Sequence, residues 1–102
     1  MKYIVNKEQL QVIGDNMSKV IKSYLSDSTW ICDIVTHPTE TDEDDAIFDI
    51  YVYLKTSELN KLDDLSKHGL SVAVRNKVHL FVEKWFPFKE EDIYVGTLDK
   101  DC

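Results

Sequence analysis

Apolar residues in the first quarter of the chain recur at helical spacing, directly after a capping sequence. Asn6 is a good helix N-cap, and Gln9, three residues later, completes a capping-box pattern. The apolar positions that follow would share one face of a helix: Leu10, Ile13, Met17, Val20, Ile21, Tyr24 and Leu25. The pattern predicts a helix from Asn6 to the polar segment 26–29, in which Gly14 costs about 1 kcal/mol relative to alanine.

Alternating residues then predict two strands, at 30–35 and 47–55. On the first strand, the core side is assigned to Trp30, Cys32 and Ile34. On the second strand, the core face is the one without charge, made of Phe48, Ile50, Val52 and Leu54. The opposite faces of the two strands would form an open surface made of Ile31, Val35, Asp49, Tyr51 and Tyr53. Asp33 would lie next to these residues, and Tyr94 of a later strand would join them.

The second half of the chain predicts a long helical region and one more strand. A helix begins near Thr56 and continues until Phe86, because Pro87 disfavours helix in the residue before it. The sequence Lys67-His68-Gly69 predicts a break or kink within this region. The aromatic residues Trp30, Phe81, Trp85 and Phe86 are assigned to the core. A third strand is expected at 93–98, followed by a loose tail at 99–102.

The element order is helix, strand, strand, kinked or double helix, strand, which predicts one α+β domain over residues 1–98. The helices are expected to cover one face of a three-stranded sheet and to leave the other face open. The first two strands would form an antiparallel hairpin. The helical connection before the third strand predicts a parallel, right-handed crossover. The pattern leaves the strand order undecided.

Acidic residues are concentrated in the connector between the first two strands. The net charge is −7, and five of the negative charges come from Glu40, Asp42, Glu43, Asp44 and Asp45. A concentrated negative loop can dock on a basic protein surface or imitate nucleic acid, or it can simply be a solvated loop. The run lacks the glycine and the alternating carboxylates of a calcium-binding EF-hand loop.

The other charged cluster is basic and lies in the second helical region. His68, Arg75 and His79 are spaced seven and four residues apart, so a continuous helix would place them on one side. This basic stripe is the one candidate site for an anion, and the alternative is a solvated helix face paired with carboxylates such as Glu83. With 12 basic against 19 acidic residues, nucleic acid is an unfavourable partner.

Candidate catalytic and metal-binding groups are few. Cys32 and His37 are separated by an odd number of residues, so a regular strand would point them to opposite faces. The chain has no nucleophile elbow and no phosphate-cradling glycine loop, and its His and Cys spacing does not match a metal site. Cys32 and Cys102 are expected to be free thiols in a reducing compartment. The prediction is therefore a protein that is not an enzyme and uses no cofactor.

Tyrosines on an open sheet face suit protein contact, because each offers a large area at low entropy cost. The aromatic residues could also stack on RNA bases, but the neighbouring aspartates would repel the phosphates. The alternative is that tyrosine is simply a good strand residue. No apolar run reaches the ~18 residues of a membrane span, and the opening residues lack the apolar stretch of a signal peptide. A soluble, cytoplasmic protein is therefore expected.

Two resemblances add expectations. The order helix–strand–strand–helix–helix–strand resembles the type II KH domains, although the Gly-x-x-Gly loop of those that bind nucleic acid is absent. The opening Met-Lys-Tyr-Ile-Val-Asn-Lys-Glu-Gln and the composition look like small uncharacterised proteins of tailed bacteriophages. This second resemblance implies a minor virion component or an accessory protein that acts in the host cytoplasm.

The leading hypothesis is a non-enzymatic interaction module that binds another protein, or itself, through the open face and the acidic loop. One alternative is an acidic inhibitor that imitates nucleic acid in the basic groove of a host enzyme. A second alternative is a KH-like RNA-associated factor that uses Arg75, Lys77 and His79.

Overall fold

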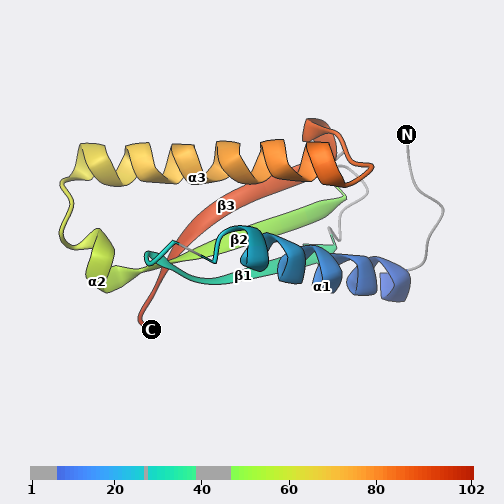
Figure 1. Cartoon of the computed structure of the whole chain (residues 1–102), viewed down its shortest axis with the longest axis horizontal. Helices are drawn as coiled ribbons and strands as arrows, with labels where there is room; N and C mark the ends of the chain where they lie inside the picture. The colour runs from blue at the N-terminus through green and yellow to red at the C-terminus, as the bar shows by residue number, and fades with distance from the viewer. Residues whose placement is uncertain (1–6, 27, 39–46) are drawn as a thin grey trace.

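The computed structural model describes residues 7–26, 28–38 and 47–102 (Figure 1). Its elements are α1 (Lys7–Tyr24), β1 (Ile31–Pro38), β2 (Phe48–Lys55), α2 (Thr56–Leu59), α3 (Asp64–Trp85), the short 3-10 helix η1 (Glu90–Asp92) and β3 (Ile93–Lys100). The α+β class and the order of elements are confirmed. The helical region between β2 and β3 is double, with one short and one long helix.

The three strands form one sheet in the order β1-β2-β3, so β2 is the central strand. β1 and β2 pair antiparallel, and β2 and β3 pair parallel, which confirms the predicted directions of both pairings. The parallel pairing requires a crossover, because β2 ends at the opposite end of the sheet from the start of β3. α2 and α3 supply that crossover (Figure 1).

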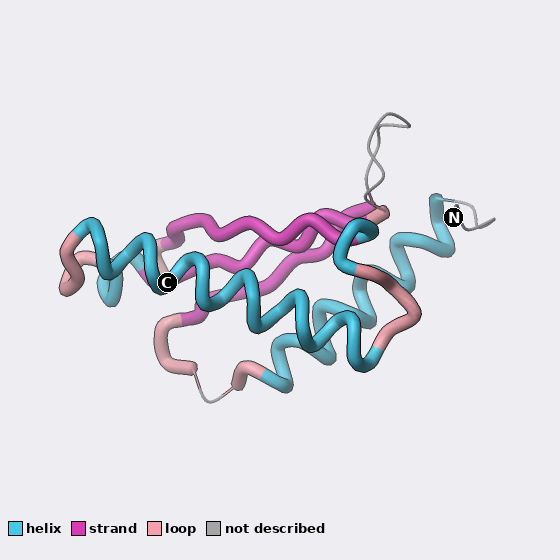
Figure 2. Tube along the Cα trace, turned by 90° about the horizontal axis from the view of Figure 1, so that it is seen from above, coloured by secondary structure: helices cyan, strands magenta, loops and turns pink. Residues whose placement is uncertain are grey.

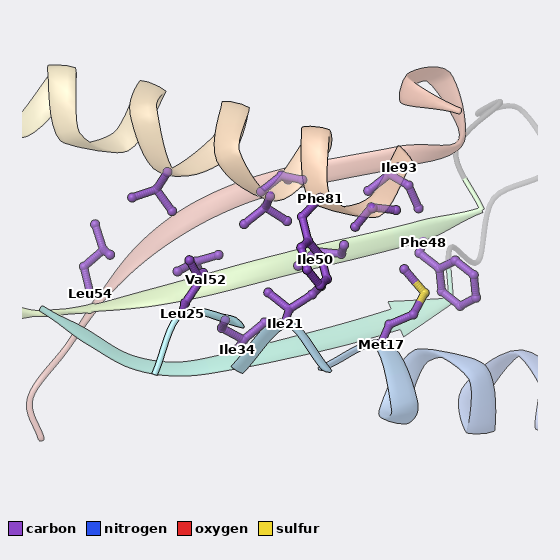
Figure 3. Close-up of a cluster of buried hydrophobic side chains, with 14 of the residues drawn as sticks. Met17, Ile21, Leu25, Ile34, Phe48, Ile50, Val52, Leu54, Phe81 and Ile93 are labelled. Atoms are coloured by element: carbon purple, nitrogen blue, oxygen red, sulfur yellow. The ribbon is translucent and has the colours of Figure 1, made fainter. Parts of the chain in front are cut away.

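Both long helices lie on the same side of the sheet, which leaves the other side without a helical cover (Figure 2). The alternation along β2 follows this arrangement: Phe48, Ile50, Val52 and Leu54 are fully buried, as predicted, and the residues between them are half-buried. The same core includes Met17 and Ile21 of α1, Leu25 directly after it, and Phe81 of α3 (Figure 3). α3 also contributes Val74, Val78 and Val82. Each such side chain adds roughly 1.5–3 kcal/mol of burial free energy.

α1 approaches the backbone of β1 closely at Gly14. A β-carbon at this position would lie 3.2 Å from the carbonyl oxygen of Thr36 and 3.5 Å from Cε1 of Phe48. One turn further along, the Ser18 hydroxyl donates a hydrogen bond of 2.8 Å to Oγ1 of Thr36, and both residues are buried. Gly14 therefore weakens the helix as expected from its propensity, but it also permits close packing of α1 on the sheet.

The predicted break at Lys67-His68-Gly69 is wrong, because α3 continues through it. The interruption lies earlier, between α2 and α3, where the Asp63 side chain accepts a hydrogen bond of 2.7 Å from the backbone N–H of Ser66. This cap satisfies one of the free N–H groups at the start of a helix and fixes where α3 begins. Gly69 is exposed and does not end the helix, since a single glycine costs only about 1 kcal/mol.

Two further predictions need correction. Trp85 is 64% exposed rather than part of the core, because it is the last residue of α3 and extends beyond the sheet-facing part of the helix. The tail predicted at 99–102 is not loose over its whole length. β3 continues to Lys100, which pairs with Lys55, so two of these four residues belong to the sheet.

Candidate functional site

The uncovered side of the sheet carries a grid of side chains from all three strands. We define the open face by its residues: Asp33, Val35 and His37 of β1; Asp49, Tyr51, Tyr53 and Lys55 of β2; and Tyr94, Gly96, Leu98 and Lys100 of β3. The pairing register of the three strands aligns these residues in rows that run across the sheet, such as His37, Asp49 and Tyr94. The four predicted residues Val35, Asp49, Tyr51 and Tyr53 are brought together here.

The fifth predicted residue of this surface, Ile31, lies on the other side. The pairing register shifts between Ile31 and Asp33, so that Cys32 is an extra residue in a β-bulge. Ile31 consequently pairs with Leu54, a buried core residue, and it packs against the core. Its placement on the open face was wrong because one inserted residue reverses the alternation on that end of the strand.

Three rings span the strands at one end of the open face. The centroids of the Tyr51 and Tyr94 rings are 6.3 Å apart and their planes are inclined at 65°, and the centroid of the His37 ring lies 6.4 Å from that of Tyr51. Both tyrosines converge over Gly96. A β-carbon there would be 3.2 Å from Cε2 of Tyr94 and 3.5 Å from Cδ1 of Tyr51. The absence of a side chain at position 96 therefore leaves room for both rings to approach the backbone of β3 closely.

The phenol of Tyr51 stays protonated over the physiological range. Desolvation by its neighbours raises the pKa of Tyr51, and the negative charge of Asp49 raises it further. A neutral hydroxyl beside a carboxylate can donate a hydrogen bond to a ligand without first losing a proton. This property suits recognition, whereas a nucleophilic or basic role would require a lowered pKa.

Charge is distributed unevenly along the open face. Asp49 lies at the end where β2 starts, and Lys55 and Lys100 form a pair in the register at the other end. The Lys100 ammonium lies 5.4 Å from the centroid of the Tyr53 ring, within reach of a cation–π interaction. Pro38 and Phe48, which border the segment that contains the acidic residues, pair with each other at the Asp49 end.

Asp33 is a special case among the charges, because it is neutralised within the chain. The Lys22 ammonium of α1 reaches it at 2.6 Å. The hydrogen bond from Lys22 is the main cause that lowers the pKa of Asp33, against the opposing effect of its partial burial.

The residues of the predicted acidic loop lie outside the described residues. They are Glu40, Asp42, Glu43, Asp44 and Asp45.

The two cysteines are joined at the lysine end of the sheet. Cys32 and Cys102 form a disulfide, with their α-carbons 6.3 Å apart. The expectation of two free thiols was wrong, because the strand order puts both cysteines at the same end of the sheet. The pairing also removes Cys32 from consideration as a nucleophile, since a disulfide sulfur has no thiolate.

The basic stripe of His68, Arg75 and His79 lies on one continuous helix, α3, and its three side chains have different surroundings. His68 is exposed, and Nε of Arg75 donates to the carbonyl oxygen of Ser71 in its own helix. His79 is half-buried, and its Nδ1 atom is buried with no hydrogen-bond partner among the described residues. Lys77 does not join them, because its ammonium lies 5.5 Å from the Tyr24 ring of α1.

Gly96, Leu98 and the contribution of His37 to the open face were not predicted from the sequence, and Tyr94 was predicted only as an addition to this surface. The alternation of Tyr94, Gly96, Leu98 and Lys100 along β3 could have identified that strand's contribution. His37 was missed because the first strand was ended at residue 35, whereas β1 continues to Pro38.

In the segments that the structure describes, no three His, Cys, Asp or Glu side chains are grouped to hold a metal ion. None of the described helices has the length and apolar character needed to cross a membrane. No protein-family model, curated protein or solved structure matches the chain. The resemblance to type II KH domains therefore remains one of element order.

Proposed function

We propose that this chain is a non-enzymatic protein-interaction module that binds another protein chain through the open face. An accessory or minor structural protein of a tailed bacteriophage would act in this way. The observation that carries the proposal is the aromatic and apolar surface in the middle of the open face, bordered by charges.

The exposure of the side chains supports this function. Tyr94 is 52% exposed and Leu98 is 45% exposed, although both lie on a strand that packs its other side into the core. Together with the half-buried Tyr51 and Tyr53, they make a contiguous surface rather than scattered apolar residues. Covering apolar surface contributes about 25 cal/mol per Å², so contact with a partner would be favourable.

The charges favour a protein over a nucleic acid as the partner. Stacking of a base on Tyr51 or Tyr94 would bring a phosphate near the Asp49 carboxylate, which lies in the same row as Tyr94. Lys55 and Lys100 are too few to offset this repulsion in a chain with 19 acidic and 12 basic residues. Protein interfaces, in contrast, commonly combine tyrosines at the centre with charged residues at the rim.

The test compares a pair of changes on the open face with a single control change elsewhere on the surface. Tyr94→Ser with Leu98→Ser removes the exposed centre of the open face. Leu80→Ser is the matched control, because Leu80 is 68% exposed but lies on α3, on the other side of the sheet. Pull-down from the cells that naturally make the protein, together with sedimentation of the pure protein, measures binding to other chains and to itself.

We expect wild type and the Leu80→Ser variant to bind the same chain, and the double variant to bind it at least tenfold more weakly, which corresponds to about 1.4 kcal/mol. Circular dichroism establishes that all three proteins are folded. Equal binding by a folded double variant would contradict the proposal.

A further inference from the structure

We infer that the partner of the open face is a second copy of this chain, packed face to face with its strands antiparallel to those of the first. This inference rests on the proposed function and names its partner. The two-fold axis would run across the strands and cross β2 at Val52.

The argument begins with the separation of charge along β2. Asp49 and Lys55 are six residues apart on one face of the strand, which is a distance of about 20 Å at roughly 3.3 Å per residue. The negative end is thus well separated from the positive end, where Lys55 and Lys100 lie side by side. A purely acidic or purely basic partner would match only one end, whereas a second copy carries both charges at the same spacing.

Charge also decides between the two ways in which the faces can meet. With the two-fold axis parallel to the strands and centred on β2, Asp49 would face Asp49 of the second copy, and Lys55 would face Lys55. With the axis perpendicular to the strands, Asp49 faces Lys55 of the second copy, and symmetry makes this pair twice. The second arrangement therefore pairs the opposite charges of β2, whereas the first pairs like charges, and both are aligned packings of two sheets.

The centre of the face fits the same arrangement. Because Val52 is midway between positions 49 and 55, the two-fold axis places Tyr51 opposite Tyr53 of the second copy. On β3, Thr97 is level with Val52, so Leu98 of one copy is opposite Gly96 of the other. Leu98 would then contact the Tyr94 and Tyr51 rings, which lie over Gly96.

The ends of β3 add a further match. Tyr94 and Lys100 are three residues on either side of Thr97, so Tyr94 of one copy is opposite Lys100 of the other. Lys100 already lies over an aromatic ring, that of Tyr53, in its own chain. A second ring from the partner copy would surround the ammonium with aromatic faces, which strengthens a cation–π interaction by removing water.

The experiment uses charge reversal within one chain. Sedimentation equilibrium gives the dimer dissociation constant for wild type, Asp49→Lys, Lys55→Glu and the variant that carries both changes. Each single variant places like charges opposite each other twice, so we expect its dimer to dissociate at least tenfold more readily. The double variant exchanges the two ends and restores opposite charges, so its dissociation constant should return close to the wild-type value.

The outcomes separate this inference from the proposed function. If wild type is a monomer but loses another protein partner with Tyr94→Ser and Leu98→Ser, the dimer is overturned and the proposed function stands. A dimer that is insensitive to the two single charge changes overturns the antiparallel pairing. The antiparallel pairing is also overturned if both single changes weaken the dimer and the folded double variant does not restore it. Recovery in the double variant supports the inference, because general damage to the fold would add up rather than cancel.

Discussion

Gly14 and Gly69 occupy the interiors of the two long helices, and substituting them tests the packing of α1 against β1. Glycine in a helix interior is about 1 kcal/mol less favourable than alanine. At Gly69, a β-carbon meets nothing within 4 Å. Gly69→Ala should therefore raise the free energy of unfolding by about 1 kcal/mol, which raises the melting temperature of a domain of this size by about 5 °C.

At Gly14 the same gain in helix propensity is opposed by a steric conflict. The new methyl group would lie 3.2 Å from the carbonyl oxygen of Thr36 and 3.4 Å from its Cγ2 atom. The oxygen belongs to the backbone of β1, so it cannot move without disturbing the sheet. Overpacking of this kind costs about 1–3 kcal/mol, which makes Gly14→Ala neutral to destabilising. Gly14→Leu should lose about 3 kcal/mol, because the side chain would also meet the Phe48 ring.

Urea unfolding followed by circular dichroism measures all four variants, Ala and Leu at each position, with the slope against urea as a check on two-state behaviour. The leucine variants should differ by about 4 kcal/mol, since Gly69→Leu retains the gain in helix propensity. If Gly14→Leu were as stable as Gly69→Leu, α1 could not lie on β1 as described, and the reasoning would be refuted.

Two more predictions concern the polar contacts between α1 and β1. Ser18→Ala should lower the free energy of unfolding by about 1–3 kcal/mol, because it leaves the buried Thr36 hydroxyl without a partner; adding Thr36→Val should recover most of that loss in the same urea assay. The pair of Lys22 and Asp33 contributes stability above the unfolded-state pKa of about 4 and loses it as the pH falls through the lowered folded-state pKa. The difference in unfolding free energy between wild type and Lys22→Met should therefore be largest near pH 7 and shrink below pH 4; a difference independent of pH would contradict this account.

The sequence predicted the parts of the fold in which local pattern and burial coincide. The core face of β2 is an example, since alternation alone identified Phe48 and its three companions. The bulge at Cys32 could not be predicted, because no glycine or proline marks it, and it moved Ile31 from the open face to the core. The disulfide was missed for a different reason, since it depends on the strand order that sequence pattern left open. Gly69 was overrated as a break because local propensity was considered without the cap at Asp63.

The candidate site was predicted in the same uneven way. Tyr51 and Tyr53 were identified because β2 is a regular strand with a clear charged face. The contributions of Gly96 and Leu98 depend on β3 pairing in parallel beside β2, which is a tertiary property. The role of Gly96 in particular, to leave room for the Tyr51 and Tyr94 rings, follows only from the register between distant segments.

The parallel pairing of β2 with β3 also sets the order in which the sheet can form. Every residue pair in that ladder is 45 residues apart in the chain, as Phe48 and Ile93 are, whereas the β1–β2 hairpin closes over a short connector. Long-range pairing is slow, because the chain must lose loop entropy before the contact compensates for it. β2 therefore spends the early part of folding as an unprotected edge rich in aromatic and β-branched residues. Asp49 and Lys55 interrupt that edge with charge, so they would also limit aggregation while the sheet is still incomplete.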